Sequence, residues 1–330
     1  MRGPKVVMIG GGTGSFALLS VLKDYVQDIT ALVNMADDGG STGILRDELG
    51  VLPPGDVRQC LVALSRSSGQ IRELFNYRFP EGTFEGHSFG NLFLTAVEKM
   101  SDNFSEAVDV ASQVLNIQGR VLPMTLDDIR LRIKFSDGSV EKGEINIGHM
   151  DFKGRLRPEL SLEPKGEINP VAKEAIEGAD IIVIAPGNLY GSIGPALIID
   201  GVKEALNRSQ AKLVYVCNLM TKLGQTDGFD VRDYASEIER LIGTPRLDYV
   251  LYNNSQPDSQ LVDRYSADKE FPVGWSLEKL ISQKYKAIGG NFISDVIHHK
   301  NSSDTLRPEN TFIRHNGDAI ARQLMKIYYS

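Results

Sequence analysis

The stretch Lys5–Leu22, KVVMIGGGTGSFALLSVL, decides the fold. It opens with a mostly β-branched apolar run, Lys5 to Ile9, which is typical of a strand buried on both faces of a parallel sheet. Gly10 to Gly14 predict a tight turn, and Ser15 to Tyr25 carry apolar residues at helical spacing. A strand, a glycine turn and a helix in this order predict an α/β fold whose first loop can bind an anion.

The same alternation continues along the chain. Further strands are predicted at Ile29–Val33, Asp180–Ile184, Lys212–Cys217 and Leu247–Tyr252. Two segments with period-two alternation, Ile129–Phe135 and Ser139–Ile147, predict a hairpin. We therefore expect a single α/β domain over residues 1–330, with a Rossmann-like, doubly wound, mostly parallel sheet and a small antiparallel insertion around 119–165.

Composition narrows the class of protein. The 330 residues are 42% hydrophobic and 24% charged with a net charge of -7, which is ordinary for a globular protein and offers no basic run for nucleic acid. Cys60 and Cys217 have neither disulfide-framework nor metal spacing, so we expect buried, reduced thiols. No apolar run is long enough for a bilayer span or a signal-peptide core. We expect a cytoplasmic protein without membrane insertion.

The first candidate site is the turn Gly10-Gly11-Gly12-Thr13-Gly14-Ser15. Backbone N–H groups in such a turn can approach a phosphate, and the helix that follows adds its dipole. The dinucleotide fingerprint G-x-G-x-x-G requires glycine where Ser15 stands, so the pattern for NAD is weak. A tight turn that binds nothing is the alternative, but four glycines in five residues favour anion binding.

The second candidate site, NMADDGGSTG at 34–43, follows the second predicted strand. Asp37 and Asp38 are candidates to hold a divalent cation or to act as a catalytic base. The alternative is a polar turn with Asx-type capping. Polar and small side chains at a strand end favour a site, whose candidate members are Asn34, Asp37, Asp38, Gly40, Ser41 and, one turn later, Arg46.

Two more loops precede predicted helices. Asp56 is placed to cap a helix that runs through Leu64, and ligand contact is the other interpretation. His87 and Asn91 begin another helix, where His87 could donate to a phosphate, act as a general acid or simply cap the helix. Both loops therefore contribute candidates whose role the sequence leaves open.

The last two candidate loops follow later strands. The loop PGNLYGS at 186–192 repeats the strand, glycine turn and helix of the first site, and Asn218-Leu219-Met220-Thr221 suits recognition of a base or ribose. The binding candidates here are Gly187, Asn188, Tyr190, Ser192, Asn218, Met220 and Thr221. Because carboxyl ends of parallel strands share one edge, these loops are expected to converge. The sequence contains neither a P-loop nor a G-x-S-x-G elbow.

Several of these strings, above all NMADDGGSTGILR, PPGDVRQCLVAL and GHSFGNLFL, identify a resemblance. With PGNLYGSI and CNLMTKLGQTDGF they resemble the gluconeogenesis factor family, within the CofD-like superfamily that includes 2-phospho-L-lactate transferase. The resemblance covers nearly the whole chain and implies one CofD-like domain that binds UDP-sugars such as UDP-N-acetylglucosamine or UDP-glucose. The positions that it carries to the pocket are residues 11–15 with Asn34, Asp37, Asp38, Ser41, Arg46, His87, Asn91, Gly187, Asn188, Ser192, Asn218 and Thr221.

The resemblance also implies a bacterial role in growth on gluconeogenic carbon sources and in control of cell shape and envelope precursors. Since no nucleophile–base pair is recognisable, a non-catalytic regulator that signals to partner proteins is the leading hypothesis. A transferase that uses Asp37 or Asp38 with Mg²⁺ on a nucleoside diphosphate ester is the alternative, and NAD binding is a third. A homodimer is expected from the family, and the polar segment His299–Asn310 is a candidate partner contact.

Overall fold

Seven parallel strands form the main sheet of the computed structural model, which describes residues 3–155, 157–295 and 313–330. The strand order is β10-β9-β8-β7-β1-β2-β3, and each neighbouring pair is parallel. The strands are β1 (Lys5–Ile9), β2 (Asp28–Val33), β3 (Arg120–Pro123), β7 (Ile181–Ile184), β8 (Lys212–Val216), β9 (Tyr249–Asn253) and β10 (Lys286–Gly290). The predicted parallel sheet is confirmed.

The order of the strands creates a switch point beside β1. From β1 the chain builds β2 and β3 on one side, and it later returns to add β7 on the other side. Ile9 at the end of β1 pairs with Leu32 of β2 and with Ile184 of β7. In open parallel sheets the crevice at such a reversal is where ligands bind. A ligand is therefore expected at the loops after β1 and β7.

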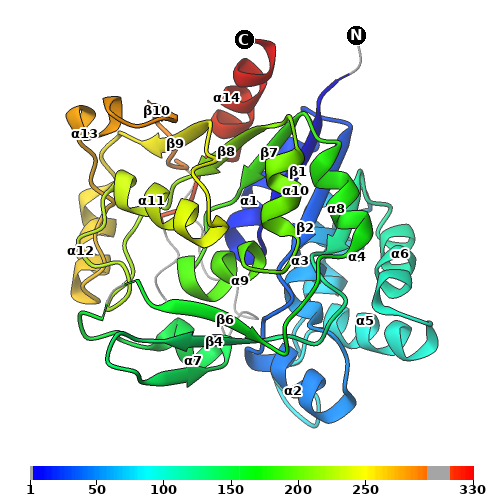
Figure 1. Ribbon diagram of the computed structural model, residues 1–330. Helices are drawn as coiled ribbons and strands as arrows, with labels where there is room; N and C mark the ends of the chain where they lie inside the picture. Colours follow the sequence, from blue (N-terminus) through cyan, green and yellow to red (C-terminus); the bar gives the residue numbers. More distant parts are fainter. Residues whose placement is uncertain (1–2, 156, 296–312) are drawn as a thin grey trace.

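Helices cover both faces of the sheet, with α8 and α10 in front of it in Figure 1 and α1 behind. They are α1 (Gly12–Leu22), α2 (Gly40–Leu49), α3 (Pro54–Leu64), α4 (Gly69–Asn76), α5 (Phe89–Met100), α6 (Phe104–Val114), α8 (Pro170–Glu177), α9 (Gly194–Leu197), α10 (Val202–Arg208), α11 (Val231–Ile242), α12 (Ser259–Ala267), α13 (Leu277–Ile281) and α14 (Gly317–Tyr329). A π-helical turn, η1 (Leu189–Ile193), precedes α9. Apolar faces of most of these helices and both faces of β1 and β7 form the main core, while α12 packs in a smaller separate cluster around Leu219 and Tyr265.

A second, antiparallel sheet forms the insertion, with β4 (Arg130–Lys134) between β5 (Val140–Lys142) and β6 (Glu159–Glu163). The hairpin prediction was wrong in its second half, because the strand stops at Lys142 and a short helix, α7 (Glu144–His149), follows. Gly143 ends the strand with a φ of +89°, and the Asp38 carboxylate accepts hydrogen bonds from the N–H groups of Glu144 and Ile145. Asp38, which is distant in the sequence, thus caps the N-terminus of α7 and favours a helix there instead of a strand.

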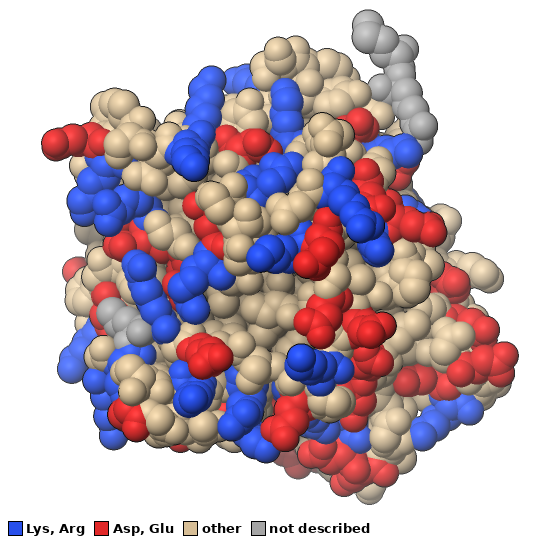
Figure 2. All heavy atoms as spheres, in the orientation of Figure 1, with Lys and Arg blue, Asp and Glu red and all other residues tan. Residues whose placement is uncertain are grey.

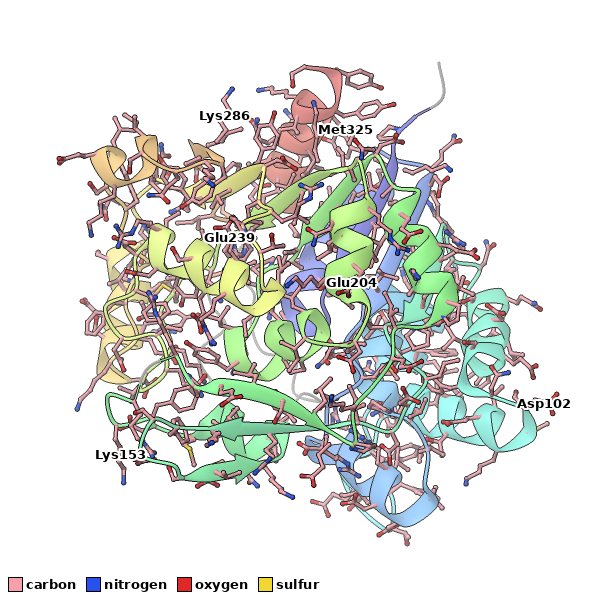
Figure 3. All side chains as sticks on the ribbon, viewed as in Figure 1. Asp102, Lys153, Glu204, Glu239, Lys286 and Met325 are labelled. Carbon is pink, nitrogen blue, oxygen red and sulfur yellow. The ribbon has the colours of Figure 1, made fainter. Side chains whose placement is uncertain are left out.

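The insertion is narrower than 119–165, because Arg120–Pro123 form β3 at the edge of the main sheet. Figure 3 shows Lys286, the first residue of β10, at the top and Lys153, between α7 and β6, at the bottom. The insertion therefore lies beyond the carboxyl ends of the parallel strands. Buried Gln225 ties it there, since its Nε2 donates to the Ile147 carbonyl at 2.7 Å.

The surface charge, the cysteines and the helix lengths can be compared with the predictions from composition. Lys and Arg are mixed with Asp and Glu over the face drawn in Figure 2, and acidic side chains gather over α5 and α6. Cys60 and Cys217 are free and buried, as predicted. Within the described ranges, no helix has both the length and the apolar character needed to cross a bilayer. The segment His299–Asn310 lies outside the described residues.

Candidate functional site

The loop after β1 presents backbone donors to the switch point. Gly11 is the N-cap of α1 and offers no side-chain cap, and no acidic residue occupies the first turn of the helix. Gly12 has a φ of +65°, the left-handed conformation that glycine tolerates best. Ser15, 1% exposed, carries a buried hydroxyl oxygen without a hydrogen-bond partner in the described structure. Such a loop suits an anion that accepts from the N–H groups and from Ser15 Oγ.

The loop after β7 touches this first loop. A Cβ atom on Gly14 would lie 1.9 Å from the Pro186 carbonyl oxygen, and one on Gly10 would lie 3.0 Å from the Ala185 Cβ. The two backbones can therefore approach so closely only because both positions are glycine. The contact joins the ends of two neighbouring strands, so the predicted convergence of the glycine loops exists at this edge.

Two asparagines hold the β7 and β8 loops in place. Asn188 Oδ1 accepts from the N–H groups of Tyr190 at 3.2 Å and Gly191 at 3.0 Å, which caps η1. Asn218 Nδ2 donates to the Gly187 carbonyl at 2.7 Å, and the Tyr215 hydroxyl donates to Asn218 Oδ1. Each asparagine thus organises loop backbone.

The two aspartates after β2 have different surroundings. Asp37 Oδ1 accepts from the Gly39 N–H at 3.0 Å, and burial is the main cause that raises the pKa of Asp37. Both carboxylate oxygens of Asp38 instead accept hydrogen bonds from the start of α7, one from the Glu144 N–H at 3.1 Å and the other from the Ile145 N–H at 2.8 Å. Asn34 closes an Asx turn onto the Ala36 N–H. Asp37 is therefore the aspartate of this pair that stays inside the site.

Asp56 reaches the first glycine loop, contrary to its predicted capping role. The N-cap of α3 is Pro53, and Asp56 lies within the first turn. A Cβ on Gly11 would lie 2.0 Å from Asp56 Oδ2, so the carboxylate packs directly against that glycine. Burial, and then repulsion from Asp37, raise the pKa of Asp56 to about 7. The cap prediction failed because Pro54 and Gly55 begin the helix earlier.

Glu144 is a site residue that the sequence did not reveal. As the first residue of α7 it extends from the insertion, and a Cβ on Gly191 would lie 2.7 Å from Glu144 Oε1. Burial, and then repulsion from Asp37, Asp56 and Asp38, raise the pKa of Glu144 to about 8. The only local hint was an acidic residue after Gly143, because its place depends on the insertion folding under the sheet.

The carboxylates of Asp37, Asp56 and Glu144 give the site an unusual charge state. Desolvation and mutual repulsion raise the pKa of all three half-buried acids, to about 7 for Asp56 and about 8 for Glu144. These two carboxyls therefore carry protons near neutral pH, which suits general acid or base chemistry. Oxygen donors also suit Mg²⁺ in kind. In the part of the chain that the structure describes, however, no three His, Cys, Asp or Glu side chains are grouped to hold a metal ion. We therefore derive no step through a metal.

A buried polar network lies behind the β2 loop. Ser41 Oγ is 2.9 Å from His87 Nδ1 and accepts from Asn91 Nδ2 at 3.2 Å. Asn91 Oδ1 in turn accepts from Arg58 Nε at 2.9 Å. Ser88, the N-cap of α5, fixes the start of this helix. The structure thus brings His87, Asn91 and Ser41 together, with Arg58 as a member that the motifs did not single out.

Other candidates have structural contacts of their own. Arg46 binds the Asp37 and Ile129 carbonyls at 2.6 and 2.7 Å and pairs with Asp128, which ties the β2 loop to the insertion. Thr221 exchanges two hydrogen bonds with the Phe271 backbone. Tyr190 is buried in the core, and Met220 forms an isolated antiparallel β-bridge with Pro272. Gly40 is the first residue of α2. Ser192 in η1 and Thr13 in the first turn of α1 are half-buried.

A histidine from the C-terminal segment joins the edge after β8. His315 Nε2 is 3.0 Å from the Cys217 carbonyl oxygen. Burial lowers the pKa of His315 to about 4, so the ring is neutral at physiological pH. Nothing in the surrounding sequence marks this residue, because its position depends on the chain returning from β10 to the edge.

Comparison with known proteins supports the fold described above. The family model for 2-phospho-L-lactate transferase CofD matches residues 6–293. The chain belongs to the CofD family. That match spans all seven strands of the sheet and every loop of the candidate site. The fold and the family resemblance predicted from the loop motifs are therefore confirmed.

Relatives within this family extend over nearly the whole chain. A protein of Thermoanaerobacterium thermosulfurigenes is 42% identical over 328 residues, which is 98% of this chain and 97% of its own length. The gluconeogenesis factor of Bacillus subtilis is 36% identical over 98% of both chains. A crystal structure of a UPF0052 family member from Bacillus halodurans has a TM-score of 0.89 at 35% identity, covering 98% of this chain and 99% of that one.

Proposed function

We propose that this chain binds a UDP-sugar with its diphosphate on the loops after β1 and β7, and that it acts as a regulator rather than as an enzyme. The carrying observation is the contact of two glycine loops at the switch point, next to a buried Ser15 hydroxyl without a partner. A diphosphate supplies the acceptor that the Ser15 hydroxyl lacks, and it would take the place of the Asp56 carboxylate that now accepts from the Gly12 N–H.

Relatives named gluconeogenesis factors support the regulatory part of the proposal. From them we infer a cytoplasmic role in growth on gluconeogenic carbon sources and in control of envelope precursors and cell shape. Such a role requires protein partners, and a homodimer would be compatible with it.

Calorimetric titration with UDP-N-acetylglucosamine, UDP-glucose, NAD and GDP tests the ligand. We expect a measurable heat of binding with at least one UDP-sugar, and the absence of binding heat with both would refute the proposal. Ser15→Ala should weaken binding about tenfold, because it removes one hydrogen bond to a charged oxygen. Ser112→Ala is the matched control, since its hydroxyl bonds only within α6. Competition by NAD would show that it uses the same pocket.

The second candidate is a transferase acting on a nucleoside diphosphate ester, favoured by the half-buried acids Asp37, Asp56 and Glu144 and by the transferase named in the family model. A carboxyl that carries its proton near neutral pH can protonate a leaving oxygen or deprotonate an attacking one. Product formation from a UDP-sugar that disappears in Asp37→Asn, while binding persists, would establish this function and displace the regulator.

A further inference from the structure

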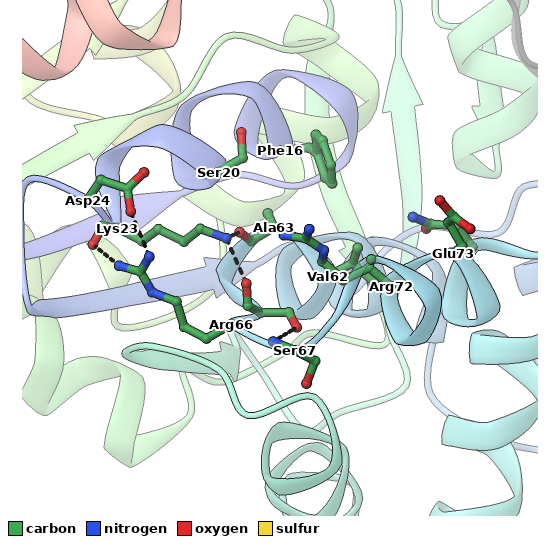
Figure 4. A pocket seen from close by; sticks show the side chains of 13 residues that line it. Phe16, Ser20, Lys23, Asp24, Val62, Ala63, Arg66, Ser67, Arg72 and Glu73 are labelled. Atoms are coloured by element: carbon green, nitrogen blue, oxygen red, sulfur yellow. Dashed lines mark hydrogen bonds and ion pairs between the residues drawn. The ribbon is translucent and has the colours of Figure 1, made fainter.

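A groove lies between three helices, away from the strand edge. The middle of α1, the last turn of α3 and the start of α4 enclose about 590 Å³, as Figure 4 shows. Phe16 and Val62 supply apolar wall, while Lys23, Arg66 and Arg72 supply positive charge. This volume lies within the range of small-molecule sites, which runs from roughly 300 to 1,000 Å³.

Lys23 is the most unusual side chain in this groove. Only 7% of the residue is exposed, and its ammonium donates to the Ala63 and Ser65 carbonyls at 2.7 and 2.8 Å. Among the described residues no carboxylate forms an ion pair with it. Burial, followed by repulsion from Arg66 and Arg72, lowers the pKa of Lys23. The three cations outnumber the two carboxylates of the lining, Asp24 and Glu73, and Asp24 pairs with Arg66, so positive charge remains that an anion can neutralise.

The two arginines differ in their availability. Arg66 is engaged, since it pairs with Asp24 at 2.8 Å and donates to the Lys23 carbonyl. Arg72 has no ion pair within the described ranges, and Figure 4 shows its side chain extending from α4 toward the Lys23 ammonium. The N-cap of α4, Ser68, makes no side-chain cap, so backbone N–H groups of this helix start also remain as donors.

We propose that this groove is a second ligand site, which binds the phosphate group of a small phosphorylated metabolite. Phosphate accepts charge-assisted hydrogen bonds from arginine and N–H groups, and it neutralises the positive charge that the groove gathers. The site is separate from the strand edge, because α1 and α3 direct their N-terminal ends to the glycine loop and their later turns to the groove.

Hydrogen–deuterium exchange with inorganic phosphate tests the proposal, with sodium chloride at equal ionic strength as the reference. We expect slower exchange in residues 65–72 of the wild type. Arg72→Gln should weaken this effect about tenfold, whereas Arg72→Lys should keep most of it. Arg208→Gln is the matched control, because Arg208 is an exposed arginine on α10 with a single long contact to Glu177 at 3.7 Å.

Three outcomes would overturn the second site. One is protection confined to the glycine loops at 10–15 and 186–192, and another is no protection beyond that caused by chloride. The third is equal protection in Arg72→Gln and Arg208→Gln. None of these readouts depends on UDP-sugar binding, so failure at one site remains distinguishable from failure at the other.

Discussion

The two proposed phosphate sites, at the strand edge and in the helical groove, would hold their ligands with opposite chemistry. At the strand edge the donors are backbone N–H groups on glycine loops, and the ionisable neighbours are the acids Asp37, Asp56 and Glu144. In the groove the donors are charged side chains led by Lys23 and Arg72. The first arrangement depends on backbone shape and on protonation, whereas the second depends on unpaired positive charge.

The largest effect is expected from breaking the shape of the strand edge. Gly14→Ala would place a methyl group 1.9 Å from the Pro186 carbonyl oxygen, so the two loops must separate. We expect a loss of about 3 kcal/mol in the free energy of unfolding, together with loss of UDP-sugar binding. Urea unfolding checks the first part and calorimetry the second.

Gly274→Ala is the control for that substitution, because no atom lies within 4 Å of the added methyl group. It should change the free energy of unfolding by less than about 0.5 kcal/mol. Equal stability of the two variants would show that the loops do not need their close contact.

Protonation of the strand-edge acids should make stability depend on pH. Their pKa values are raised to about 7 for Asp56 and about 8 for Glu144, so the folded state binds protons more tightly than the unfolded chain. The stabilisation is complete below a pH of about 4 and is lost as the pH rises through 7 and 8. Urea unfolding should show lower stability at high pH, with the decline lying between about pH 4 and about pH 8.

Glu144→Gln should flatten part of this pH dependence, because the amide does not ionise. The matched control is Glu85→Gln, which changes an exposed loop residue and should leave the profile of the wild type. A profile that is unchanged in Glu144→Gln would contradict the buried position of this carboxyl.

Hydrogen bonds through Arg58 link the two regions. Asn76, which lines the groove, accepts from Arg58 at 2.5 Å, and Arg58 also donates to Asn91 in the strand-edge network. Asn76→Ala should cost about 1 kcal/mol of stability and weaken phosphate binding in the groove less than Arg72→Gln does. Thermal melting and the exchange experiment measure the two effects, with the exposed Asn207→Ala as control.

The smallest expected effect is a difference in how strongly added salt weakens ligand binding at the two sites. The charge of the partly exposed Arg72 is screened by added chloride, so phosphate binding in the groove should weaken several-fold between low and high salt. UDP-sugar binding on buried backbone donors should change less than about twofold. Titrations over a series of salt concentrations give the salt dependence of affinity at each site. Equal dependence at both sites would contradict the proposed difference in their chemistry.

Much of the strand edge was predictable from local sequence. The run Lys5–Ile9 followed by glycines predicted β1, its loop and α1, and the Gly187–Ser192 loop repeated that pattern after β7. Motifs that recur in this order also predicted the CofD family. The groove was not predictable, because Lys23, Arg66 and Arg72 belong to three different segments with no shared pattern.

Local sequence was enough to predict β1, β2, β7, β8 and β9, the glycine-rich loops and the family, because these properties depend on residues close together in the chain. It did not predict β3, β6 or β10, and it extended the hairpin into α7. Tertiary structure alone decided that Asp38 caps α7, that Asp56 faces Gly11 instead of capping α3, and that Glu144 comes from the insertion to the switch point. Burial and repulsion between distant carboxylates set their protonation, and those forces exist only after the chain has folded.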